Sequence, residues 1–128
     1  MTKYLLDTHV VLWLAKNSPL LSTTAKNAIF DTASEKFVSI VSAWEVAIKI
    51  ASQKLHVDGG LLEFFKMLDD NGFTVLPVEK KYVLRLPALA DHHKDPFDRL
   101  LIATAQVEKM TILTVDENIH KYDVSSIW

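Results

Sequence analysis

The sequence predicts one α/β domain over residues 1–128, with a central, mostly parallel sheet of four to five strands flanked by helices. Two observations predict this class. Short apolar runs alternate along the chain with longer segments of helical periodicity, which is typical of strands and helices in turn. The short runs are apolar on both sides, as strands must be in a parallel sheet that helices cover on both faces. No linker, repeat or low-complexity tract divides the chain, and its length suits a single core.

The first three elements follow from apolar spacing and helix-start signals. Residues 3–7, KYLLD, form a short apolar run that ends in an acid, which favours a buried strand. Residues 8–16 have helical spacing, with Trp13 at a packing position and with Asp7 or the following threonine as the cap. After a turn, Ser22 or the following threonine starts a second helix.

The middle of the chain continues the alternation. Residues 36–42, KFVSIVS, are rich in β-branched and aromatic side chains and predict the second strand. Residues 42–55 form an amphipathic helix, and we expect Trp44 and Ile48 to pack in the core. Residues 59–72 form a further helix bracketed by glycines. Its inward side chains are expected to be Leu61, Leu62, Phe65 and Leu68 or Met67.

The last part of the chain holds the clearest helix. Residues 73–78 predict a third strand stopped by a proline, and residues 79–89 a short helix. Residues 95–110 carry apolar side chains at the i, i+3, i+4 and i+7 spacing of a buried helix face. Residues 111–116 form the fourth strand, again ending in an acid, and residues 117–128 a helical turn with a final edge strand.

The composition excludes several classes of site. The chain has no cysteine, which rules out disulfides, a thiol nucleophile and a cysteine-ligated zinc site. Its formal charge is −2, so no global basic field points to nucleic acid. The N-terminal apolar run does not resemble a signal peptide, and no segment approaches the roughly 20 apolar residues of a membrane span. We therefore expect a soluble, cytoplasmic protein without a membrane partner.

Four acids are predicted to converge at one edge of the sheet. Asp7 ends the first strand and Asp116 ends the fourth. Glu45 and Asp98 stand in the first turns of their predicted helices. In an open parallel sheet, ligands gather beyond the carboxyl ends of the strands, where the helices begin. Two strand tips and two helix starts therefore deliver carboxylates to one region.

Helix capping explains each acid when it is taken singly, and Asp7 and Asp116 could cap the helices that follow them. Ser42 and Glu45 fit a Ser-x-x-Glu capping box. Asp95, Pro96 and Asp98 fit the N-cap, N1 and N3 positions of the clearest helix. We assign Asp95 to this structural role.

Capping explains less when the four acids are taken together. Caps have no need to be carboxylates, and clustered carboxylates repel one another and raise one another's pKa values. Such an arrangement is costly unless a cation offsets the charge. Carboxylates without a histidine or cysteine set favour Mg²⁺ or Mn²⁺ over zinc.

Four segments, LLDTHVVLW, SIVSAWEVAIK, DPFDRLLIATA and LTVDENI, resemble the four acidic motifs of the PIN-domain family. They are especially similar to the VapC-like ribonuclease toxins of bacterial toxin–antitoxin modules. The resemblance covers essentially the whole chain, in order. It implies that Asp7, Glu45 and Asp98 are the core metal-binding and catalytic acids and that Asp116 is the fourth, more variable one. Thr114 matches a hydroxyl often found near that acid.

The resemblance also implies an activity and partners. It implies an endoribonuclease that depends on Mg²⁺ or Mn²⁺ and hydrolyses RNA phosphodiester bonds. It further implies a homodimer and a small antitoxin whose C-terminal segment lies in a groove near the acids. The candidate groove contacts, for each of which core packing is the alternative, are Leu12, Trp13, Leu55 and Leu61.

Several other polar residues near the acids are candidates for substrate contact. His9 could touch a substrate phosphate or be a partly buried structural histidine. Arg99 could reach a phosphate or pair with a neighbouring acid. Together with Thr114, they form the predicted substrate-binding set. His92 and His93 are expected to lie in a solvated loop, because adjacent histidines rarely bind one ion.

Two other functions compete with a nuclease. The first is a catalytically silent PIN-like module that binds RNA or protein, which the intact acids disfavour. The second is a phosphotransfer receiver domain, which needs an acid pair near the first strand and an aspartate ending a middle strand. Here the first strand offers only Asp7, and the strand at 36–42 ends without an aspartate. No Gly-x-Ser-x-Gly elbow or P-loop is present.

Overall fold

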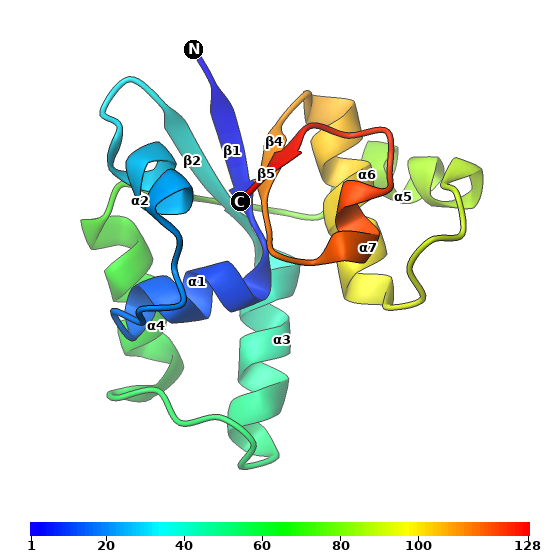
Figure 1. Cartoon of the computed structure of the whole chain (residues 1–128). Coiled ribbons are helices and arrows are strands. Elements are labelled where there is room, and N and C mark those ends of the chain that lie inside the picture. The colour runs from blue at the N-terminus through cyan, green and yellow to red at the C-terminus, as the bar shows by residue number, and fades with distance from the viewer.

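The computed structural model describes residues 1–128 as a five-stranded parallel sheet with helices on both faces (Figure 1). The strand order is β3-β2-β1-β4-β5, which places the first strand at the centre. This confirms the predicted fold class. The strands are β1 (Lys3–Leu6), β2 (Glu35–Ser39), β3 (Thr74–Leu76), β4 (Thr111–Leu113) and β5 (Ser126–Ile127).

Seven α-helices and one short 3-10 helix connect the strands. Figure 1 shows α1, α2 and α4 on one side of the sheet and α5, α6 and α7 on the other. None of these helices combines the length and the hydrophobicity that a membrane span requires. The helices are α1 (Thr8–Ala15), α2 (Thr23–Phe30), α3 (Ile40–Ala51), α4 (Gly60–Asp70), α5 (Lys80–Arg85), the 3-10 helix η1 (Leu86–Ala88), α6 (Pro96–Glu108) and α7 (Glu117–His120).

The central strand divides the core into two layers. Successive side chains of a strand point to opposite faces, so Leu5 and Leu6 enter different clusters. Leu6 packs with buried side chains of α1, α2, α3 and α4, whereas Leu5 packs with those of α6 and α7. Both leucines are fully buried. The strands are apolar on both sides because helices cover both faces of the sheet, as the sequence predicted.

The parallel register brings the strand tips together. Leu6 of β1 lies opposite Leu113 of β4, so the residues that follow them, Asp7 and Thr114, leave the sheet side by side. The backbone N–H of Asp7 donates to the Leu113 carbonyl at 3.1 Å, which extends the pairing by one residue. This carboxyl edge of the sheet is where α1, α3 and α7 begin.

The predicted start of the third helix is wrong. β2 passes into α3 without a turn, and Ser39 is the N-cap, with its Oγ accepting from the Val41 N–H. Ser42 therefore lies inside the first helical turn, and Glu45 lies in the second turn rather than the first. The capping box proposed for Ser42 and Glu45 does not exist. Glu45 is consequently left without a capping role.

Three predicted core positions are also wrong. Trp44 is 59% exposed, Ile48 is 44% exposed and Leu62 is 81% exposed. α3 is apolar on both sides, and Ala43 and Val46 face the core instead. In α4 the fully buried side chains include Phe64, which the periodicity argument missed. The reason is that the sequence of a helix with two apolar faces does not indicate which face packs against the sheet.

Candidate metal centre

Three acids of the predicted set influence one another at the carboxyl edge of the sheet. Burial raises the pKa of Asp98 to about 7, and the negative charges of Asp7, Asp95 and Glu45 contribute to the increase. These acids come from β1, α3 and the start of α6, so their mutual influence is a product of the fold. Uncompensated negative charge of this kind is what a bound cation would offset.

Asp7 is the most buried acid, at 4% exposure, and it is the N-cap of α1. Its Oδ1 accepts from the backbone N–H of His9 at 2.9 Å. Its Oδ2 accepts from the Thr114 hydroxyl at 2.7 Å. Burial alone would raise the pKa of Asp7, but the hydrogen bonds from His9 and Thr114 outweigh it and hold this pKa below its ordinary value. Asp7 is thus a fixed, ionised carboxylate.

Thr114, which follows β4, links Asp7 to Asp116. Its hydroxyl donates to Asp7 and accepts from the backbone N–H of Asp116 at 3.0 Å. Thr114 is fully buried. The hydroxyl therefore acts as donor and as acceptor within the protein, and it fixes Asp7 relative to the loop that carries Asp116.

Asp98 stands at N3 of α6, as predicted, but it does not cap the helix. Asp95 is the N-cap, and its Oδ1 accepts from the backbone N–H groups of Phe97 and Asp98 at 2.8 and 3.4 Å. The predicted capping role of Asp95 is thereby confirmed. The Asp98 carboxylate is left free to face the other acids.

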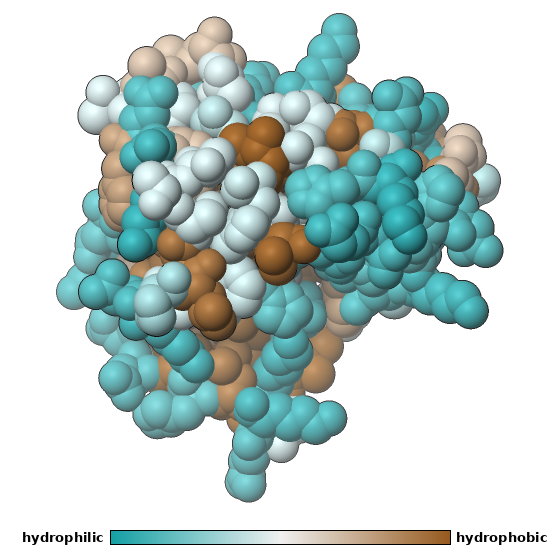
Figure 2. All heavy atoms as spheres, in the orientation of Figure 1, coloured by the Kyte–Doolittle hydropathy of each residue, from teal (hydrophilic) through white to brown (hydrophobic).

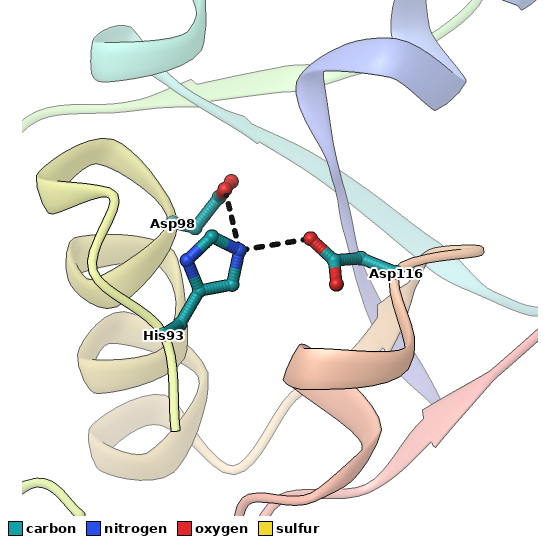
Figure 3. A group of neighbouring side chains, drawn as sticks. All are labelled: His93, Asp98 and Asp116. Carbon is teal, nitrogen blue, oxygen red and sulfur yellow. Dashed lines mark hydrogen bonds and ion pairs between the residues drawn. The ribbon is translucent and has the colours of Figure 1, made fainter. Parts of the chain in front are cut away.

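Asp116 and Asp98 are brought together by a histidine (Figure 3). Nε2 of His93 lies 2.8 Å from Oδ2 of Asp116 and 3.1 Å from Oδ2 of Asp98. These three side chains offer ligand atoms within 4.8 Å of one another. The expectation of a solvated loop is wrong for His93, whose side chain is only 14% exposed, and correct for His92, which is exposed. No local signal distinguished the two, because the contact is made to a residue 23 positions away.

Glu45 borders the same region from α3. Its Oε2 lies 3.4 Å from Nζ of Lys49 one helical turn on, and its side chain is 14% exposed. The start of α3 is tied to the start of α1 by a buried hydrogen bond from the Thr8 hydroxyl to Ser42 Oγ, at 2.9 Å. This bond relates the helix carrying Glu45 to the strand tip carrying Asp7.

His9 and Arg99, the remaining predicted substrate contacts, lie in different environments. The His9 side chain is 61% exposed, with Nδ1 3.6 Å from Asp7 Oδ1, and hydrogen bonding to Asp7 raises the pKa of His9. The guanidinium of Arg99 is occupied within the protein. It donates to the carbonyl of Ala90 at 3.0 Å and to the Tyr122 hydroxyl at 3.2 Å, so it holds the loop before α6.

The donor set suits a hard divalent cation. Carboxylate oxygens predominate, and Mg²⁺ or Mn²⁺ prefers oxygen ligands. Burial is the main cause of the raised pKa of Asp98, and the negative charges of Asp7, Asp95 and Glu45 add to it, so these acids lie close enough to act on one another. The residues present therefore fit Mg²⁺ or Mn²⁺.

Comparison with known proteins identifies the family. The model of the PIN domain family matches residues 4–125. The chain is 29% identical over 124 residues to Ribonuclease VapC22 of Mycobacterium tuberculosis (strain ATCC 25618 / H37Rv), covering 95% of this chain and 93% of that protein.

Solved structures share the fold at low sequence identity. One is VapBC2 from Rickettsia felis bound to a DNA fragment from its promoter, with a TM-score of 0.77, 12% identity and 98% of each chain covered. Another is DNA-bound VapBC from Salmonella typhimurium, with a TM-score of 0.73, 14% identity and 99% and 98% coverage. Because the family model matches nearly the whole chain, this protein belongs to the PIN domain family.

Proposed function

We propose that the protein is a metal-dependent endoribonuclease and the toxin of a toxin–antitoxin pair, acting in the cytoplasm. The observation that carries the proposal is the meeting of Asp98 and Asp116 at His93, close enough to the negative charges of Asp7 and Glu45 that these charges, after burial, help to raise the pKa of Asp98 to about 7. The similarity to a curated ribonuclease over almost the full chain supports RNA as the substrate. We assign catalysis and metal binding to these acids and Asp116.

The acids divide the work of holding a cation. Asp7 supplies a charged oxygen before any ligand arrives, because two hydrogen bonds stabilise its ionised form. Asp98 and Asp116 supply further oxygens beside His93, and Glu45 borders the region from α3. A bound Mg²⁺ or Mn²⁺ supplies an activated water and positive charge to offset the phosphate and the leaving oxygen.

Of the three predicted substrate-binding residues, we assign one to contact with RNA and two to structural roles. We assign contact with an RNA phosphate to His9, because it is exposed and its pKa is raised beside Asp7. Thr114 is fully buried and serves to hold Asp7. Arg99 serves to hold the loop before α6.

A groove between α1 and α4 supports the antitoxin proposal. It has a volume of about 590 Å³, and Leu12 and Phe64 are among its lining residues. Figure 2 shows apolar surface, in brown, over this junction. The similar structures include complexes described as VapBC and as toxin–antitoxin. Leu12 also belongs to the buried core, and the other candidate contacts, Trp13, Leu55 and Leu61, pack against that core. Leu55 lines the neighbouring hollow as well.

An apolar face of α3 supports the homodimer proposal. Ile40, Trp44 and Ile48 are spaced by four residues, and all three are exposed. Trp44 packs edge-on against Phe97, with ring centroids 5.2 Å apart. An exposed apolar stripe of this kind is typical of a protein–protein contact. Light scattering at micromolar concentration should show a dimer, and a Trp44→Lys variant should shift it to monomer.

A cleavage assay tests the central proposal. The parent protein should cut RNA with Mg²⁺ or Mn²⁺ and stop when EDTA is added. An Asp7→Asn variant that retains its circular dichroism spectrum should be inactive under both conditions. Binding of RNA without cleavage in either metal would instead favour the catalytically silent module.

A further inference from the structure

The loop that carries His93 is anchored by side chains from elsewhere in the fold. The Tyr122 hydroxyl accepts from the backbone N–H groups of His92 and His93, at 3.1 and 2.9 Å. Arg99 donates to the same hydroxyl and to the carbonyls of Ala90 and His93. Tyr122 itself is buried at 6% exposure. Hydrogen bonds to Tyr122 and Arg99 therefore hold the loop that positions the imidazole of His93.

One hydrogen bond fixes which nitrogen of His93 carries the proton. The backbone N–H of Asp95 donates to His93 Nδ1 at 3.1 Å, so the lone pair of Nδ1 is occupied. In a neutral imidazole the hydrogen then lies on Nε2. Nε2 is the nitrogen that faces Oδ2 of both Asp98 and Asp116.

This tautomer makes His93 a donor rather than a ligand. A metal ion would need the lone pair of Nε2, which requires the proton to move to Nδ1 and breaks the bond from Asp95. A carboxylate oxygen has more than one lone pair, so Oδ2 of Asp116 can accept from Nε2–H and still bind a cation. Asp116 Oδ1 already accepts from the Asn118 N–H at 2.8 Å. With both oxygens held, the plane of the Asp116 carboxylate is fixed.

We propose that His93 is a positioning residue of the metal centre: its Nε2–H turns Asp116 toward Asp98 and holds the two carboxylates ready for a divalent cation, without binding the cation itself. This inference rests on the proposed function, since it concerns the same acids. Asp116 is the acid that most needs such a partner, because its side chain is 30% exposed and it follows a strand that ended three residues earlier.

Three variants and one spectrum test the proposal, with Mn²⁺ as the probe and the full chain as the protein. His93→Ala removes the donor, and Mn²⁺ affinity by isothermal titration should fall about 10–100-fold, as is usual when a partner of a metal ligand is lost. His93→Gln keeps an N–H donor near the position of Nε2, and its affinity should stay within about threefold of the parent. His92→Ala is the matched control from the same loop and should bind as the parent does.

Electron spin echo spectroscopy of the Mn²⁺-loaded parent separates donor from ligand without any substitution. We expect no coupling from a directly bound imidazole nitrogen. A coupling that is present in the parent and lost in His93→Ala would make His93 a ligand and overturn the proposal. Equal Mn²⁺ affinity in His93→Ala and the parent would also overturn it.

The same experiment distinguishes failure of the inference from failure of the proposed function. A parent protein that binds no Mn²⁺ would overturn the metal centre, and the role of His93 with it. Tyr122→Phe provides a second route if His93→Ala does not fold. It leaves the imidazole intact but removes the hydroxyl that holds the loop, and Mn²⁺ affinity should fall severalfold; an unchanged affinity would contradict the proposal.

Discussion

Asp7 and Asp98 are chemically identical groups at the same edge of the sheet, yet their pKa values move in opposite directions. Asp7, at the tip of the central strand, has a pKa below its ordinary value. Asp98, in the first turn of α6, has a pKa raised to about 7. Burial disfavours the charged form of both carboxyls. The difference therefore lies in what surrounds each one.

Hydrogen-bond donors account for the contrast. The strand tip gives Asp7 a backbone N–H from His9 and the hydroxyl of Thr114. At α6 the first-turn N–H groups are already satisfied by Asp95, so Asp98 receives none of them. His93 lies 3.1 Å from Asp98 Oδ2 and lowers its pKa, but burial and the neighbouring acids outweigh this effect. Asp7 is thus ionised before a cation binds. Asp98 becomes fully ionised only when a cation offsets the negative charges of the neighbouring acids.

The largest expected effect is the loss of RNA cleavage when Asp98 is replaced. Asp98→Asn should lower the rate of RNA cleavage about 100-fold or more, because it removes a charge placed for the transition state. Asp95→Asn is the matched control three residues away, and it should lower the rate far less, because asparagine is an equally good N-cap. The comparison fails if Asp95→Asn abolishes cleavage while Asp98→Asn does not.

A second effect concerns the pH dependence of metal binding. Below pH 7 Asp98 holds a proton that a cation must displace, so Mn²⁺ affinity should fall by up to about tenfold per pH unit. Asp7 is still ionised in this range and should not contribute. Isothermal titration between pH 5.5 and 8 measures the slope, and Asp98→Asn should flatten it. A parent protein with pH-independent affinity would contradict the raised pKa.

Stability of the metal-free protein should change in opposite directions at the two acids. A raised pKa means that the folded state binds the Asp98 proton more tightly, so stability falls as pH rises from about 4 to 7. Asp98→Asn should therefore stabilise the protein at pH 7.5 by roughly 1–3 kcal/mol, with the difference vanishing near pH 4.

For Asp7 the sign reverses. A lowered pKa contributes stability that is present above the ordinary value of 3.8 and is lost as pH falls through the folded value. Asp7→Asn should destabilise the protein at pH 7.5 by roughly 1–2 kcal/mol, since it weakens the bonds from His9 and Thr114. Chemical denaturation with EDTA present measures both variants, and changes of the same sign would remove the contrast.

The smallest effect is expected at Glu45. It lies in the second turn of α3 and makes an ion pair with Lys49 at 3.4 Å, but it caps nothing. Glu45→Gln should change the free energy of unfolding by less than about 0.5 kcal/mol, because i,i+4 pairs of this kind are weak. A loss near 1 kcal/mol would instead indicate that the helix start depends on this side chain.

Much of the fold and of the inner centre was predictable from the sequence. Alternating apolar runs and helical segments gave the order of elements, and the rule that ligands gather at strand tips placed Asp7 correctly beside the later acids. The capping pattern Asp-Pro-Phe-Asp correctly gave the N-cap to Asp95 and left Asp98 free. These features depend on local spacing, which a sequence displays directly.

The errors occurred where tertiary contacts decide between equivalent local patterns. Ser39 and Ser42 both fit a helix start, and only the absence of a turn after β2 selects Ser39. His92 and His93 are neighbours of one type, and the meeting with Asp116 selects His93. Trp44 lies on one of two apolar faces of α3, and the packing of the other face leaves it exposed. None of these choices is visible in a window of adjacent residues.

Carboxyl titration by carbon-13 NMR tests the contrast between the two acids most directly. In metal-free protein, the Asp98 carboxyl should titrate near pH 7 and the Asp7 carboxyl below 3.8. Saturating Mg²⁺ should move the Asp98 midpoint down by at least about one unit, since the cation stabilises its charged form, and leave Asp7 ionised throughout. Two carboxyls that titrate together near 4, and that do not respond to Mg²⁺, would contradict the account.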